Sequence, residues 1–137
     1  MGADWVMDVE SNVYSKVRAR TMTKLKKDFP NIKFTTEDEN RNETKFPTVY
    51  IHLMDAIPQG DDLQAESING VLATFEVRVT TNTDKDDATE VMRHILNAFV
   101  DLKFRVVTAS IPSKRNDNYV SSSRFRRTIG ASETIDF

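Results

Sequence analysis

The chain has no cysteine, only four glycines and four prolines, and no long apolar run. The lack of cysteine excludes disulfides, thiolate metal ligands and cysteine nucleophiles. The glycines are widely scattered, so there is no glycine-rich phosphate-binding loop. No apolar run approaches the ~20 residues of a membrane span, and the N-terminal residues lack the pattern of a signal peptide. We therefore expect a soluble cytoplasmic protein with no membrane partner.

Charged residues are abundant but balanced. The 19 Lys and Arg residues face 21 Asp and Glu residues, which gives a net charge of -2. Proteins that bind nucleic acid normally carry a basic patch or stripe, so the charge gives no case for a nucleic-acid partner. With 137 residues and 39% hydrophobic content, the chain is predicted to form one domain over residues 1–137.

Hydrophobic spacing predicts two helices. The first is expected over residues 4–28, where valines recur at helical intervals and Pro30 stops the helix. Valine is a mediocre helix former, so a strand is not excluded there. The second helix is expected after a cap at Thr83 or Asp84, because residues 88–102 form a broad apolar stripe.

Alternating residues predict a sheet beside these helices. Residues 48–54 are apolar on both faces, which favours a central strand buried on two sides. We expect an α+β fold with two helices packed on one face of a four- to five-stranded, mostly antiparallel sheet, in the order α-β-β-α-β-β. This order is a split βαβ arrangement cut at a different loop. The expected strands are 48–54, 71–82, 104–111 and 119–129, with or without a fifth at 32–36. Mobile loops are expected at 37–45 and 55–69, a turn-rich link at 112–118 and a flexible tail at 130–137.

The strand at 71–82 alternates strictly between apolar and polar residues. The face of this strand that is predicted to be buried, its dry face, carries Val71, Ala73, Phe75, Val77 and Val79. Its wet face pairs the charges of Glu76 and Arg78 and does not line a pocket. We therefore expect Glu76 and Arg78 to contact a neighbouring subunit.

The residues that most often carry catalysis or bind metals have structural explanations here. His52 and His94 have no acid or nucleophile close in sequence. The acids at 84–87 lack the glycine and glutamate of a calcium loop, and helix capping explains them. Ser121–Ser123 have no nucleophile-elbow frame and serve as small residues that let another group approach closely. No catalytic residue, metal site or cofactor is predicted.

Two oppositely charged segments are candidate contact surfaces. The acidic one lies in the loop at 55–69 and consists of Asp61, Asp62 and Glu66. The basic one lies in the last strand and consists of Arg124, Arg126 and Arg127, preceded by Lys114 and Arg115 in the link. The arginines make either a charged edge strand that resists aggregation or a basic surface that meets the acidic loop of a neighbouring subunit. Arg124 and Arg126 share one strand face, while Arg127 falls on the core face.

Several of these stretches together carry a family resemblance. They are the N-terminal helix, the segment Phe46-Pro47-Thr48-Val49-Tyr50-Ile51, the long acidic loop, the strand at 71–82 running into the helix at 88–99, Lys103-Phe104-Arg105-Val106, and the arginine-rich strand at 119–129. In this arrangement the chain resembles the tail terminator (tail completion) proteins of long-tailed bacteriophages. The similarity is one of pattern and covers most of the chain.

The resemblance implies a non-enzymatic ring, usually a hexamer, that caps the finished tail tube and presents it to the filled head. Its partners are then further copies of the chain, the tail tube protein and the head–tail connector. Its place is the head-proximal end of the virion tail, after assembly in the host cytoplasm. Two alternatives stay open: a head–tail connector or minor capsid or tail component, and a stand-alone binding or regulatory domain with a concave apolar pocket.

Overall fold

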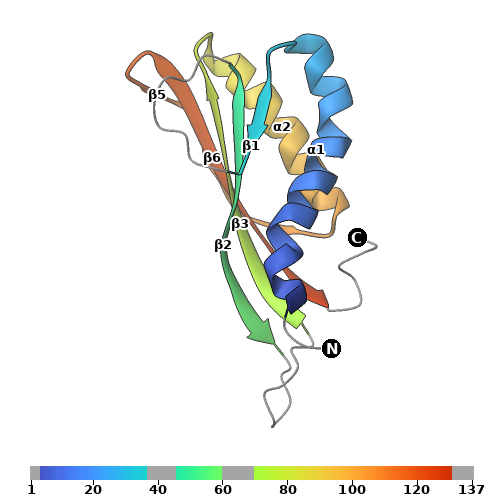
Figure 1. Cartoon of the computed structure of the whole chain (residues 1–137). Helices are drawn as coiled ribbons and strands as arrows, with labels where there is room; N and C mark the ends of the chain where they lie inside the picture. Colours follow the sequence, from blue (N-terminus) through green and yellow to red (C-terminus); the bar gives the residue numbers. More distant parts are fainter. Residues whose placement is uncertain (1–3, 37–45, 60–69, 131–137) are drawn as a thin grey trace.

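The computed structural model describes residues 4–36, 46–59 and 70–130. Within these ranges the fold is α+β, with two α-helices on one side of a six-stranded mixed sheet (Figure 1). The strand order is β1-β2-β3-β6-β4, and β5 pairs with β6 beside this path. The helical elements are η1 (Asp4–Asp8), α1 (Val9–Asp28) and α2 (Lys85–Asp101). The strands are β1 (Lys33–Thr35), β2 (Thr48–Gln59), β3 (Gly70–Thr81), β4 (Arg105–Ala109), β5 (Ser113–Arg115) and β6 (Asn118–Gly130).

The centre of the sheet is the antiparallel pair β3–β6. The two strands are in register from Gly70↔Gly130 to Thr81↔Tyr119. The five apolar residues predicted for the dry face of β3 are each 0% exposed, which confirms the alternation. In the same register, Phe75 of β3 faces Phe125 of β6 on the buried side. We call the side of the sheet that packs on the helices the inner sheet face.

Both predicted helices are confirmed. In α1 the buried residues repeat every fourth position, as an amphipathic helix requires, so the tertiary burial of its valines outweighs their weak propensity. These residues are Val9, Val13, Val17, Thr21 and Leu25. The first residues of the predicted span form the separate 3₁₀ turn η1. At the start of α2, Asp84 Oδ1 accepts a hydrogen bond from the Asp87 backbone N–H at 2.8 Å, so Asp84 is the cap.

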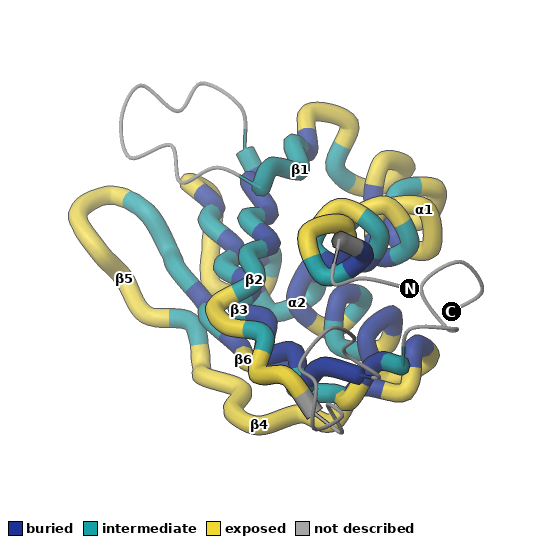
Figure 2. The backbone as a smooth tube through the Cα atoms, turned by 60° about the horizontal axis from the view of Figure 1, so that its bottom comes forward, coloured by how far each residue is buried: buried dark blue, intermediate teal, exposed yellow. Residues whose placement is uncertain are grey.

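Four phenylalanines pack the helix α2 onto the inner sheet face. The Phe99 ring of α2 stacks on the Phe125 ring of β6, with centroids 4.1 Å apart and planes at 1°. Phe104 meets Phe99 edge-on at 5.1 Å and Phe75 edge-on at 5.7 Å. Figure 2 shows the buried parts of helices and strands facing each other, whereas β4 and β5 are exposed along their length.

The structure corrects three predictions about the strands. β2 runs on to Gln59, so residues 55–59 are strand and not part of a loop. The register of β2 on β3 shifts between Leu53 and Asp55, and this bulge broke the alternation from which the strand was predicted. Tyr50 and His52 on the second face of β2 are half-buried, so burial on two sides was also wrong. The predicted link at 112–118 contains β5, which raises the number of strands to six.

Candidate functional site: the outer face of the sheet

The described helices leave one side of the sheet uncovered, and we call this side the outer sheet face. The register places alternate residues of β2, β3, β6 and β4 on it in rows that cross the strands. The residues of these rows are Tyr50, His52 and Asp55 of β2, Thr74, Glu76 and Arg78 of β3, Ser122, Arg124 and Arg126 of β6, and Arg105 of β4. The face is therefore polar and charged along these rows.

One row crosses the centre of this face through His52, Glu76 and Arg124. Arg124 Nε lies 3.4 Å from Glu76 Oε2, and the two side chains are 49% and 21% exposed. An exposed pair of this kind contributes about 0–1 kcal/mol. Glu76 of β3 is therefore paired across the strands with Arg124 of β6, not with Arg78 of its own strand as the sequence predicted, and the pair adds little to stability.

Arg78 lies over an aromatic group in the next row. Its Cζ atom is 5.0 Å from the centroid of the Tyr50 ring, which is a cation–π arrangement. Tyr50 in turn stacks on His52 along β2, with centroids 5.5 Å apart and planes at 10°. The three side chains form a flat, partly exposed group on the outer sheet face, of the kind that protein interfaces favour.

A third row runs from an acid at one side of the sheet to two bases at the other. Asp55 of β2 is opposite Thr74, Thr74 is opposite Arg126, and Arg126 is opposite Arg105. Arg126 Nε donates to Thr74 Oγ1 at 3.2 Å. Arg105 is an exposed residue of β4. Because Arg105 and Arg126 are cross-strand neighbours of like charge, this side of the face favours an acidic partner.

The three arginines that the sequence groups together are divided by the sheet. Arg124 and Arg126 lie on the outer sheet face, as their spacing predicts. Arg127 points to the other side, where its Nη1 donates to the Leu102 carbonyl at 3.1 Å, just after α2. A cation at this place satisfies a carbonyl at the C-terminal end of a helix. Arg127 therefore has a contact inside the fold.

The acidic residues predicted to meet these arginines lie outside the described residues. Asp61, Asp62 and Glu66 all fall between β2 and β3, in residues 60–69. Their contact with the arginine strand of a neighbour stays a prediction.

The two sides of the sheet end differently. β1 pairs only with Thr48–Tyr50, so beyond Tyr50 no described strand lies on that side of β2. Glu10 of α1 covers part of this edge, because its Oε2 accepts the Leu53 backbone N–H at 2.7 Å and lies 3.7 Å from His52 Nδ1. Pro58 follows in the same strand, and proline is tolerated at sheet edges. At the opposite edge, β4 is exposed throughout.

A groove of about 300 Å³, which sequence reasoning did not predict, lies between α2 and the strands β4–β6. Its floor includes Ser121 and Ser123 of β6, and their small side chains leave space under α2. The one feature of the sequence that pointed to this groove is the serine run at 121–123, which we interpreted as small residues that let another group approach closely. The helix wall consists of Thr89, Met92, Arg93 and Leu96, and the opposite wall of Ala109, Ser110, Ile111 and Pro112.

Within residues 4–36, 46–59 and 70–130, no group of three or more His, Asp or Glu residues is arranged to hold a metal ion. No helix in the described part of the chain is both long and apolar enough to cross a membrane. The prediction that His94 has no acid close in sequence was wrong, because His94 is paired with Glu90, four residues earlier in its own helix, at 3.2 Å from Nε2 to Oε1.

Comparison with known proteins adds no assignment. No protein-family model matches this chain, and no curated protein matches it.

Proposed function

We propose that this chain is a tail terminator: a virion structural protein that forms a ring on the end of a phage tail tube and joins the tail to the head. The pattern resemblance supports this proposal. The structural observation that carries it is the outer sheet face, a charged surface built on the rigid β3–β6 pair and left uncovered by the described helices.

This surface suits contact between protein subunits. It carries Glu76 and Arg78 on β3 and two arginines, Arg124 and Arg126, on β6, and the fold does not depend on these charges because the core lies on the opposite face. A face of this kind can meet a partner of complementary charge without rearrangement of the fold. In the proposed ring, which we expect to be a hexamer, such faces contact neighbouring copies, the tail tube protein and the head–tail connector.

Binding to tail tubes tests the proposal directly. Purified chain is mixed with isolated tail tubes, and the tubes are sedimented and imaged by electron microscopy. We expect the chain to sediment with the tubes and to add a ring at one end. A chain that stays monomeric at high concentration and does not bind tubes would overturn the proposal.

Charge reversal tests the role of the outer sheet face. The double variant Arg124→Glu with Arg126→Glu should weaken assembly, and partial rescue is expected from Asp61→Lys with Asp62→Lys. The matched control is Lys24→Glu with Lys26→Glu, which reverses the same charge on exposed residues of α1. Unchanged assembly of the arginine variant would reject the outer face as a contact, and loss of assembly in both variants would point to net charge alone.

The first alternative is a head–tail connector or a minor capsid or tail component. It uses the same surfaces, and only the partner separates it from a terminator. Capture of the chain by portal or adaptor protein, without capture by tail tube protein, would favour it.

The second alternative is a stand-alone binding domain, and one observation favours it. This class requires a concave apolar pocket, and five of the ten residues that line the groove beside α2 are apolar: Met92, Leu96, Ala109, Ile111 and Pro112. Native mass spectrometry of the purified chain separates the classes, because a binding domain retains a small molecule and remains a monomer or dimer.

A further inference from the structure

The exposed apolar side chains of this protein gather at the two opposite edges of the sheet. Seven large hydrophobic residues are exposed among the described residues. At the β2 edge they are Met7 (85% exposed), Met54 (39%) and Ile57 (50%). At the β4 edge they are Val100 (51%), Val106 (39%), Val107 (39%) and Ile111 (75%). Exposed hydrophobic residues that cluster in this way mark interaction sites.

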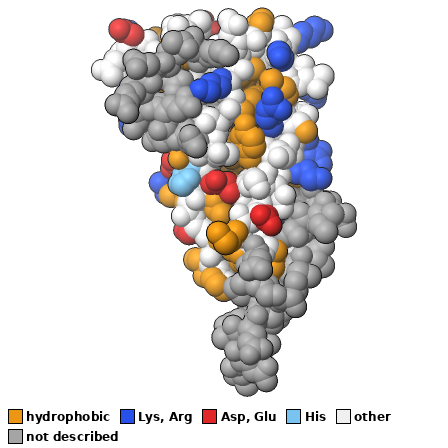
Figure 3. Space-filling view, in the orientation of Figure 1, with side chains coloured by type: hydrophobic (Ala, Val, Ile, Leu, Met, Phe, Trp, Pro, Cys, Tyr) orange, Lys and Arg blue, Asp and Glu red, His pale blue; other side chains and the backbone are white. Residues whose placement is uncertain are grey.

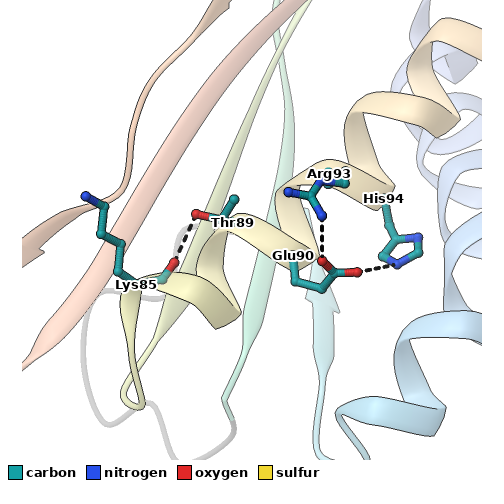
Figure 4. Close-up of polar contacts among 5 residues, drawn as sticks. All are labelled: Lys85, Thr89, Glu90, Arg93 and His94. Carbon is teal, nitrogen blue, oxygen red and sulfur yellow. Dashed lines mark hydrogen bonds and ion pairs between the residues drawn. The ribbon is translucent and has the colours of Figure 1, made fainter.

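The β4 edge is hollowed as well as apolar, because it includes the groove beside α2. Ile111 forms part of the groove wall and projects into solvent. Figure 4 shows polar contacts of α2: Thr89 donates a hydrogen bond to the Lys85 carbonyl, and Glu90 binds both Arg93 and His94. Of these five residues, Thr89 and Arg93 line the groove. Arg93 thereby stands at the groove with its side chain 63% exposed.

A buried hydroxyl in the groove has no partner. Ser123 is 0% exposed, and its Oγ makes no hydrogen bond. The other serines of this region are all satisfied, since Ser121 Oγ donates to the Ser110 carbonyl and Ser110 Oγ donates to the Ser122 carbonyl. An unpaired buried hydroxyl destabilises the fold. What Ser123 contributes to docking is its small size, which with Ser121 leaves space on the floor of the groove.

The β2 edge presents exposed apolar side chains that could contact the apolar wall of the groove, namely those of Met54 and Ile57. The hydrogen bond from the Leu53 backbone N–H to Glu10 holds the start of α1 beside β2. The start of α1 and the C-terminal end of β2 lie at the same end of the molecule (Figure 1). Figure 3 shows apolar side chains next to acidic ones on this side of the molecule. Met54 lies at the bulge of β2, and Ile57 follows in the same strand.

The charges of the two edges are opposite. Residues 5–10 and 51–58, which lie at the β2 edge, contain the acids Asp8, Glu10 and Asp55 and no Lys or Arg. Residues 103–115, which run along the β4 edge, contain Lys103, Arg105, Lys114 and Arg115 and no acid. Three negative charges of described residues thus stand at one edge and four positive charges at the other. Complementary charge of this kind steers association and fixes the orientation of partners.

We propose that the β2 edge of one copy docks on the β4 edge of the next copy, with Ile57 and Met54 at the groove beside α2. The two surfaces are different and lie at opposite ends of the strand order, so the contact is head-to-tail. A head-to-tail contact closes into a ring if its rotation allows, and otherwise it grows into a filament. The inference rests on the proposed ring function and names the contact between its subunits.

Two single variants test this contact, each of which disables one edge. Ile57→Glu places a charge on the β2 edge, and Ile111→Glu places a charge on the β4 edge. Ala19→Glu is the matched control, because it adds the same charge at an exposed position of α1. Sedimentation velocity should show self-association of the parent chain and the control, and a dissociation constant raised by about tenfold or more in each edge variant.

Mixing the two edge variants gives the decisive result. The intact β2 edge of Ile111→Glu can still dock on the intact β4 edge of Ile57→Glu, so the mixture should form one-to-one dimers that grow no further. A mixture that stays monomeric, or single variants that associate like the parent, would overturn the proposed contact. Variants that bind tail tubes as the parent does would overturn this contact and leave the ring function standing. A parent chain that is monomeric at millimolar concentration would overturn the contact as well.

Filling the groove provides a second test that does not alter charge. Ser123→Val removes the unpaired hydroxyl and adds apolar volume to the groove floor, so the fold should keep its stability or gain some. The variant should lose self-association while it unfolds at the same or higher denaturant concentration than the parent. Unchanged self-association, or a small molecule found in the parent by native mass spectrometry, would show that the groove has a different occupant.

Discussion

The inner and outer faces of the same sheet differ in what their residues do. In β6 the neighbours Phe125 and Arg124 show this most clearly. Phe125 is fully buried and stacks on Phe99. Arg124 is half exposed and reaches Glu76 across the strands. Two residues that are adjacent in the chain thus serve two purposes, because side chains alternate across a strand.

The difference in energy between the two faces is large. Burial of a Val, Ile or Phe side chain contributes about 1.5–3 kcal/mol, and the inner face buries many of them. An exposed ion pair such as Glu76–Arg124 contributes about 0–1 kcal/mol. Stability is therefore concentrated on the inner face, and the charges of the outer face contribute little to it.

The largest effect is expected from Phe125→Ala on the inner face. The substitution leaves a cavity against Phe99 and should lower the free energy of unfolding by about 3–5 kcal/mol. Urea denaturation followed by circular dichroism measures it. A loss below about 1 kcal/mol would contradict the view that the inner face carries the stability.

A smaller effect is expected from Arg127→Met, which removes the hydrogen bond to the Leu102 carbonyl. Hydrogen bonds to charged groups contribute about 1.5–3 kcal/mol, and the half-buried position should give a value near the lower end. Arg126→Met is the control on the outer face and should cost about 0.5–1 kcal/mol. Equal losses in the two variants would show that the two faces do not differ at these positions.

The N-terminal cap of α2 should contribute still less to the free energy of unfolding. Asp84→Ala removes the acceptor of the Asp87 N–H and should cost about 1 kcal/mol. Hydrogen exchange should show faster exchange in the first turn of α2, the helix that covers the inner face. Unchanged protection there would mean that other contacts hold this turn.

The smallest effect is expected for the ion pair on the outer face. A double-mutant cycle of Glu76→Ala and Arg124→Ala should give a coupling energy below about 1 kcal/mol. The coupling should fall further when salt is raised, because the pair is partly exposed. A coupling energy that is large and insensitive to salt would show that the outer face also contributes substantially to the free energy of unfolding.

Much of the fold follows from periodicity, and the misses have local causes. α1, α2, β3 and β6 are long and regular, so their residues alone indicate them. The extension of β2 was missed because the bulge after Leu53 shifts the alternation by one residue. β5 was missed because three exposed residues have no pattern of their own, and only their pairing with β6 defines the strand.

The candidate site was predicted less completely than the fold. Spacing places Arg124 and Arg126 on one face, and the register on β3 shows which neighbours they have. Nothing local indicates that Arg127 meets the Leu102 carbonyl, because these residues are 25 positions apart. The groove beside α2 was also missed, since its walls come from three separate parts of the chain.

The sequence by itself determined which residues are buried and which are exposed along α1, α2, β3 and β6, because the periodicity of these regular elements follows from their backbone geometry. It also determined the balance of charge and the absence of cysteine chemistry. Tertiary structure alone decided that the acids gather at the β2 edge and the bases at the β4 edge. Residues 5–10 and 51–58 are far apart in the chain, and only the packing of α1 against β2 brings them together.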